Sequence, residues 1–94
     1  MKLVTYRVAD EASRLGVIWD ELIVDVEDFG FEVGLDFPSN MLDFIDLGSI
    51  AVSALSEALN QAETRYLLGT SIPATNAELL APIPRPRKNI FGIG

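Results

Sequence analysis

The first 26 residues of the chain contain three short runs in which apolar and polar side chains alternate, and this pattern constrains the fold most. Alternation with a period of two gives each β-strand one apolar face. Two brief breaks, Ala9–Ala12 and Asp20–Glu21, separate the runs. Strands joined by such short turns are typical of an antiparallel β meander. The residues expected to share a strand face are Val4, Tyr6 and Val8 in the first run, Leu15, Val17 and Trp19 in the second, and Leu22, Val24 and Val26 in the third.

The middle of the chain predicts an irregular loop followed by two helices. Residues 27–40 hold two glycines, a proline and several acids, a composition typical of a loop. Asn40 is the expected N-cap of a short helix, and Gly48 lies just past its end. Ser49 is the expected N-cap of the next helix, which Gly69 ends. The expected apolar faces consist of Met41, Phe44 and Ile45 in the first helix and Val52, Leu55, Leu59, Ala62 and Tyr66 in the second.

The last quarter of the chain is expected to be extended. Residues 70–77 predict a loop, and residues 78–83 predict one more short strand or extended piece. Three prolines, at positions 82, 84 and 86, disfavour helix in the residues before them. Residues 89–94 resemble the start of another strand. The sequence therefore predicts an α+β fold: a small antiparallel β meander with two short-to-medium helices and a C-terminal extended proline-rich strap.

Charge divides the chain into two parts. Residues 1–84 carry all 14 acids and only four of the seven cations, and the other three cations follow within four positions. We therefore expect a small domain over residues 1–81 and a basic, proline-rich junction over residues 82–94. An acidic body repels phosphate backbones, so no nucleic-acid partner is expected. The residues expected to contact another domain or a partner are Arg85, Arg87, Lys88, Ile90 and Phe91.

The residue types that the chain lacks also limit its chemistry. It contains no cysteine and no histidine, so it has no disulfide, no thiolate ligand and no imidazole base. We expect no catalytic residue, no metal ligand and no cofactor within this chain. The N-terminus has no signal-peptide hydrophobic region, and no run approaches the roughly 18 apolar residues of a membrane helix. A cytoplasmic protein with no membrane partner is the expectation.

Acidic residues, serines and a terminal glycine stretch raise four weaker possibilities for a functional site. Counted from Asp25, acids fall at the first, third and twelfth places with Gly30 at the sixth, as in an EF-hand calcium loop. Phe29 occupies a ligand place, however, so a solvated acidic turn is favoured. Asp43 and Asp46 lie one helical turn apart but have no third ligand, so a role at the helix start is favoured. The remaining candidates are the serines Ser49, Ser53 and Ser56, which lack a base, and the terminal Gly92–Gly94, which no helix follows.

Aromatic side chains offer a possible ligand pocket. At this chain length they are more often needed for the core or for a patch that faces another domain. We therefore assign them to core or interface rather than to a ligand. The set consists of Trp19, Phe29, Phe31, Phe37 and Phe44.

Four stretches together resemble a known arrangement: MKLVTYRV, RLGVIWDELIVDV, MLDFIDLG and LLAPIPRPRKNIFGIG. In this order they resemble the N-terminal domain of bacterial fumarylacetoacetate hydrolase family proteins, across nearly the whole chain. The proline-rich basic junction is the most specific part. The resemblance implies a larger catalytic domain that holds Mg²⁺ on three carboxylates, with a His–Glu pair in hydrolytic members, and it implies homodimers. None of those catalytic or metal-binding positions has a counterpart among residues 1–94.

The resemblance implies an accessory domain that is not catalytic on its own. The complete enzyme would be a metal-dependent hydrolase, decarboxylase or isomerase of 2-oxo acids or β-diketones, and its substrate is not specified by this sequence. The expected partners are a catalytic domain, in the same or another polypeptide, and further copies of the chain. Two alternatives stay open: a free-standing, non-catalytic binding or self-association module, and one half of a split enzyme.

Overall fold

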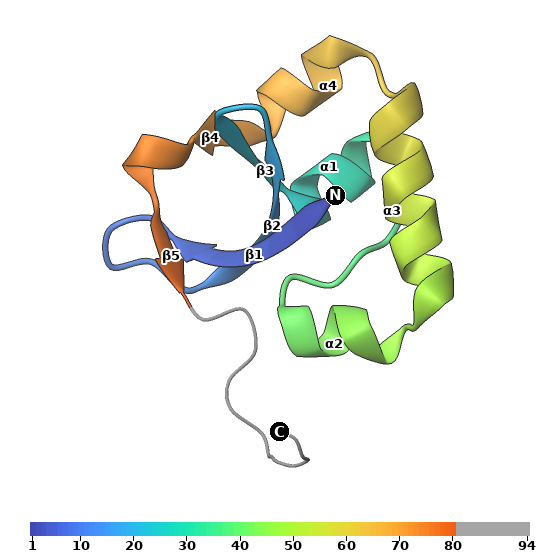
Figure 1. The fold of residues 1–94 in the computed structure, drawn as a ribbon, viewed down its shortest axis with the longest axis horizontal. Coiled ribbons are helices and arrows are strands. Elements are labelled where there is room, and N and C mark those ends of the chain that lie inside the picture. Colours follow the sequence, from blue (N-terminus) through green and yellow to red (C-terminus); the bar gives the residue numbers. More distant parts are fainter. Residues whose placement is uncertain (81–94) are drawn as a thin grey trace.

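A computed structural model describes residues 1–80 and has an α+β fold, as expected. Five strands form one curled antiparallel sheet, and four α-helices lie to one side of it (Figure 1). The strands are β1 Lys2–Arg7, β2 Arg14–Trp19, β3 Leu22–Asp25, β4 Ser71–Pro73 and β5 Glu78–Leu80. The helices are α1 Val26–Glu32, α2 Met41–Asp46, α3 Ser49–Gln61 and α4 Thr64–Gly69, with a short 3₁₀ helix, η1, at Ala74–Asn76. No helix in this part of the chain is long and apolar enough to cross a membrane.

The predicted three-strand meander is confirmed, and it forms the centre of the sheet. The strand order is β4-β3-β2-β1-β5, so the last two strands lie at opposite edges. The short segment that contains η1 joins these two edges and bridges the gap between them in the curled sheet (Figure 1). The first and last strands of the described part pair directly, with Thr5 opposite Leu80 and Arg7 opposite Glu78.

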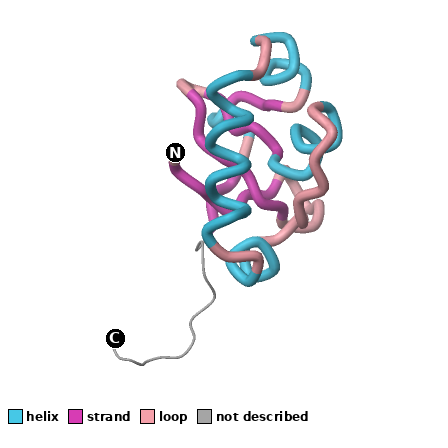
Figure 2. The backbone as a smooth tube through the Cα atoms, turned by 90° about the vertical axis from the view of Figure 1, so that its right-hand side faces the viewer, coloured by secondary structure: helices cyan, strands magenta, loops and turns pink. Residues whose placement is uncertain are grey.

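Each face of the sheet has its own apolar core, because alternate side chains of a strand point to opposite faces. The larger core lies between the sheet and the helices, and Figure 2 shows α3 running across this face. It contains Leu15, Val17 and Val24 of the strands together with Val26, Phe29, Phe37, Met41, Phe44, Ala51, Leu55 and Leu67. The smaller core lies within the curl and contains Val4, Tyr6 and Ile23, covered by Ile72, Ala74 and Ala77.

The predicted loop over residues 27–40 is wrong in its first half, which is helix α1. β3 ends at Asp25, and Val26, which was expected on the third strand, is the first residue of α1. The Asp25 carboxylate caps the helix by accepting a hydrogen bond from the Asp28 N–H. The apolar residues of α1 face the core at helical spacing, which outweighs the poor helix propensity of its internal Gly30. Gly30 lies where an added Cβ would stand 2.6 Å from the Phe37 ring, so the glycine permits a close approach.

The expected helix α2 and its Asn40 N-cap are confirmed. The Asn40 side chain accepts a hydrogen bond from the Asp43 N–H at 2.9 Å. Met41 and Phe44 are buried as expected, but Ile45 is 47% exposed and does not share their buried face. Gly48 follows the helix with φ of 81°, a left-handed conformation that glycine adopts without strain.

The second expected helix is divided into α3 and α4. Gly48, and not Ser49, is the N-cap residue of α3. The helix ends at Gln61 because Ala62 and Glu63 are both extended, and α4 then brings Leu67 into the larger core. Of the expected apolar face, Leu55 is fully buried, Leu59, Ala62 and Tyr66 pack at the edge of the core, and Val52 is exposed.

The expected loop over residues 70–77 is also wrong, because it contains β4 and η1. β4 pairs with β3, with Ile72 opposite Ile23. The following strand, β5, confirms the prediction of a short strand that begins at Glu78. The expected strap at residues 82–94 lies outside the described residues.

Candidate functional site

A buried carboxylate at the junction of β3 and α1 is the centre of a polar cluster. Asp25 is 4% exposed, and its two oxygens accept four hydrogen bonds. Oδ2 accepts from the Tyr6 hydroxyl and from Arg14 Nε, each at 2.5 Å. Oδ1 accepts from Arg14 Nη2 at 3.0 Å and from the Asp28 N–H at 2.9 Å. Since a carboxylate has about four lone-pair positions, no acceptor position of Asp25 remains for a substrate.

A glycine in β2 makes the contact between Tyr6 and Asp25 possible. Tyr6 lies on β1 and Asp25 on β3, so the phenol must cross the intervening strand. Gly16 of β2 lies opposite Asp25, and a Cβ added there would stand 2.9 Å from Tyr6 Cδ1 and 2.5 Å from Ile23 Cγ2. Glycine within a strand often marks such a close approach. The Gly16 position therefore ties the three central strands to one polar cluster.

The cluster changes the acidity of its three members. Burial raises the pKa of the Asp25 carboxyl, but the hydrogen bonds from Arg14, Tyr6 and the Asp28 N–H outweigh burial and hold this pKa below its usual range. Burial, together with the hydrogen bond to Asp25, raises the pKa of the Tyr6 phenol. The hydrogen bond to Asp25 also raises the pKa of Arg14. The cluster is therefore a carboxylate, a guanidinium and a neutral phenol over the whole ordinary pH range.

These pKa shifts predict a stability plateau between about pH 4 and pH 10. Asp25 has a lowered pKa in the folded state, so its contribution is present above pH 4 and is lost as the pH falls. Tyr6 has a raised pKa, so its contribution is present below pH 10 and is lost as the pH rises. Urea unfolding at a series of pH values measures both limits. The Tyr6→Phe variant should lose less stability than the wild type above pH 10, and equal losses would contradict this assignment.

A shallow pocket of about 300 Å³ opens beside this cluster. Tyr6, Arg14 and Asp25 line it together with Val8 and Ile72. Arg14 also pairs with Glu27 at 3.0 Å and with Asp28 at 3.5 Å, so three carboxylates surround one guanidinium. That excess of negative charge disfavours an anionic ligand, and we assign the cluster a structural role.

The calcium-like spacing from Asp25 has no counterpart in the structure. Asp25 is buried and paired with Arg14, so the favoured description of this segment as a solvated acidic turn is also wrong. Asp43 lies in the first turn of α2, as expected, and accepts a hydrogen bond from Asn40 Nδ2 at 2.9 Å. The expected role at the helix start is wrong for Asp46, which is the last residue of α2. Within residues 1–80, no group of three or more acids is arranged to hold a metal ion.

The serine and aromatic candidates are scattered over the fold. Ser53 is exposed on α3, Ser56 is half-buried beside β2, and Ser49 is an exposed residue of the first turn of α3. Phe29, Phe37 and Phe44 are buried, and Trp19 packs at the edge of the same core. Phe31 is 80% exposed on α1. The Gly92–Gly94 stretch lies outside the described residues.

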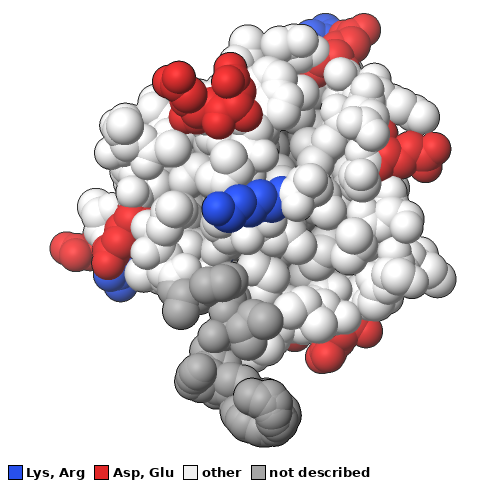
Figure 3. All heavy atoms as spheres, in the orientation of Figure 1, with Lys and Arg blue, Asp and Glu red and all other residues white. Residues whose placement is uncertain are grey.

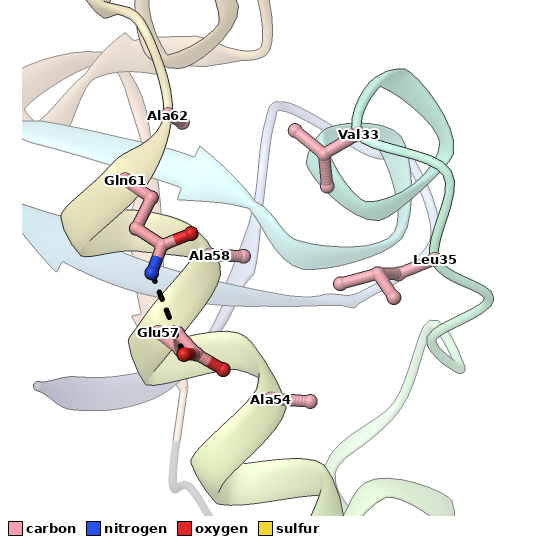
Figure 4. A pocket seen from close by; sticks show the side chains of 7 residues that line it. All are labelled: Val33, Leu35, Ala54, Glu57, Ala58, Gln61 and Ala62. Carbon is pink, nitrogen blue, oxygen red and sulfur yellow. Dashed lines mark hydrogen bonds between the residues drawn. The ribbon is translucent and has the colours of Figure 1, made fainter.

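A groove of about 340 Å³ separates α3 from the segment that follows α1. Figure 4 shows Ala54 and Ala58 of α3 pointing toward Val33 and Leu35 across it. At its rim, Gln61 Nε2 donates a hydrogen bond to Glu57 Oε2 at 3.4 Å. The short alanine side chains leave the groove open, and five of its seven lining residues are alanine, valine or leucine.

Apolar side chains gather where α2 meets α3. Half of the ten large apolar residues that are exposed in residues 1–80 fall between positions 42 and 52. We call these five residues the α2–α3 corner: Leu42, Ile45, Leu47, Ile50 and Val52, with exposed fractions of 40–82%. The lower right of the face in Figure 3, over α2 and the start of α3, is uncharged except for an acidic patch at its lower edge. The corner is thus a projecting apolar surface made by a helix, a turn and the start of a second helix.

The sequence predicted neither the polar cluster around Asp25 nor the α2–α3 corner. The polar cluster joins residues of β1, β2 and β3, and its only local signal is the glycine in the middle of the second run. The local signal for the corner is the composition of α2, which has more apolar residues than one buried face needs. The expected contact residues Arg85, Arg87, Lys88, Ile90 and Phe91 lie outside the described residues.

No protein-family model matches the chain, and no curated protein sequence matches it significantly.

Proposed function

We propose that this chain is the N-terminal accessory domain of a fumarylacetoacetate hydrolase-like enzyme and that it docks on the catalytic domain without reacting itself. The observation that carries the docking role is the α2–α3 corner. The catalytic domain belongs to the same or to a separate polypeptide, and the complete assembly is cytoplasmic and homo-oligomeric. The enzyme family in this proposal rests on the resemblance of four stretches of the sequence to that family.

The composition of α2 supports docking. Five of the seven residues from Met41 to Leu47 are large and apolar, but only Met41 and Phe44 are buried. Exposed apolar surface is unfavourable by roughly 25 cal/mol per Å², and soluble monomers rarely expose large contiguous patches. A helix that is apolar on several sides normally has a second surface packed against it. The corner is therefore suited to burial against another surface.

The polar cluster supports the view that reaction chemistry comes from elsewhere. All acceptor positions of Asp25 are occupied by groups of its own chain. The Mg²⁺ that the resemblance implies does not fit these residues, because Asp25, Glu27 and Asp28 all turn toward the Arg14 guanidinium. Substrate specificity would likewise reside in the catalytic domain.

Activity measurements test the proposal directly. The purified chain with Mg²⁺ and acylpyruvate substrates should release no product above the rate in buffer, because catalysis is supplied by another domain. Product release is followed by the loss of substrate absorbance. Turnover that persists through repurification and is abolished by a substitution in this chain would contradict the accessory role.

A free-standing self-association module is the second candidate, and the same corner favours it. Sedimentation velocity of the wild type and of Ile50→Glu separates the two. A stable dimer at micromolar concentration that the substitution dissolves would support the module. A monomer in both cases would support an accessory domain whose corner is reserved for a different surface.

A further inference from the structure

The α2–α3 corner lies in a long stretch of the chain that contains acids but no cation. No lysine or arginine occurs between Arg14 and Arg65. Asp43 and Asp46 project from α2 between the apolar residues of the corner. Beside them a hollow of about 430 Å³ is lined by Leu47, Phe37 and Pro38 together with the carboxylates of Glu27, Asp36 and Asp43. An occupant of this surface must combine apolar side chains with positive charge.

A second copy of the acidic body does not meet that requirement. Residues 1–80 contain 14 acids and four cations, which gives a net charge of −10. Two such bodies repel each other, and their acidic borders would meet at a shared corner. The last 14 residues carry three cations and no acid, a net charge of +3, so the two parts of one chain are complementary.

We propose that the chain's own residues Arg85–Phe91, which lie outside the described part, bind the α2–α3 corner. Their sequence, RPRKNIF, places three cations immediately before two large apolar residues. The aliphatic stems of arginine and lysine pack on apolar surface while their charged ends reach carboxylates. Ile90 and Phe91 provide the apolar area that the corner residues Leu42, Ile45 and Ile50 need for burial.

The connection between the two parts is long enough for this contact. The described chain leaves the sheet at Leu80, eight residues before Lys88. Eight extended residues span up to about 26 Å, at about 3.3 Å per residue. Figures 1 and 2 both show the end of β5 and helix α2 at the same end of the molecule. A contact between this segment and the corner of the same chain is therefore compatible with the length of the connection.

This inference rests on the proposed function only in treating the corner as a docking surface. It adds that the junction itself is the first layer on that surface, so a catalytic domain would meet the corner and the junction together. The contact is electrostatic at its border, so salt should weaken it.

Carbodiimide cross-linking of the full chain tests the contact. The reagent condenses a lysine amine with a touching carboxylate into an amide and takes up the released water as a urea. Lys2 and Lys88 are the only lysines, so each product is assigned by mass spectrometry. We expect an intramolecular link from Lys88 to Asp43 or Asp46, and its yield should fall as salt is added. Lys88→Arg, which keeps the charge, should abolish it.

Amide chemical shifts provide the second measurement. The triple variant Arg85→Glu, Arg87→Glu, Lys88→Glu should shift the amide signals of α2 and the first turn of α3, while those of β2 stay unchanged. Unchanged corner signals, or Lys88 links only to acids far from the corner, would overturn the contact. Links only between two copies would also overturn it. If the contact fails while the chain remains inactive and monomeric, the proposed accessory function is unaffected, whereas intrinsic turnover contradicts that function alone.

Discussion

The Asp25→Ala variant should unfold with a free energy about 3–4 kcal/mol lower than that of the wild type. The substitution removes the N-cap of α1 and leaves the buried Tyr6 hydroxyl without its acceptor. It also removes the closest partner of Arg14, although the guanidinium side chain is 36% exposed and water compensates part of that loss. Because small domains are stable by only about 5–15 kcal/mol, this loss is a large fraction of the total.

Urea unfolding followed by the fluorescence of Trp19, the only tryptophan, measures this difference. Asp28→Asn is the matched control, because its side chain is 62% exposed and lies 3.5 Å from the same guanidinium. The control should change stability by less than about 0.5 kcal/mol. A loss in Asp25→Ala no larger than that of the control would show that the cluster does not hold the strands together.

The second large effect is expected at Phe29, in the segment where the sequence predicted a loop. Phe29→Ala should lower the free energy of unfolding by about 3–5 kcal/mol, because it leaves a cavity between α1 and the sheet. Phe29 is fully buried, whereas Phe31 is 80% exposed two residues later on the same helix. Phe31→Ala should therefore change stability by less than about 0.5 kcal/mol.

The two variants Phe29→Ala and Phe31→Ala together distinguish a helix from a loop at residues 26–32. Both variants replace a phenylalanine with alanine, so any difference between their unfolding free energies reports the burial of the side chain and not its type. Thermal unfolding gives the same comparison, since 1 kcal/mol shifts the melting temperature of a domain of this size by about 4–8 °C. Equal effects of the two substitutions would mean that residues 26–32 do not present one face to the core.

The strands were predictable because their signals are local. Alternation in the first 26 residues predicted β1, β2 and all of β3, although it extended β3 by one residue, to Val26. The polar pair Asp20–Glu21 predicted the tight turn between β2 and β3. The α1 helix was not predictable in this way. The glycines at positions 30 and 34 look alike in the sequence but have opposite roles in the structure. Gly30 lies inside the helix to admit the Phe37 ring, whereas Gly34, with φ of 83°, lies just beyond its end.

The candidate site was less predictable than the fold because it depends on tertiary contacts. The bond from Tyr6 to Asp25 joins residues 19 positions apart, across an intervening strand. In the sequence, Asp25 was one acid among several, and nothing local distinguishes it from Glu27 or Asp28. The break between α3 and α4 was missed for a similar reason, since Ala62 and Glu63 are good helix formers that the fold holds extended.

The pairing of β1 with β5 has a consequence for synthesis on the ribosome. Arg7 leaves the ribosome before its partner Glu78, which follows 71 positions later. The edge of β1 therefore waits without this neighbour while most of the domain is translated, and an unpaired strand edge readily binds other chains. Closure of the domain thus depends on residues 78–80, so a nascent chain stalled before them would leave this edge of β1 open to pairing with other chains.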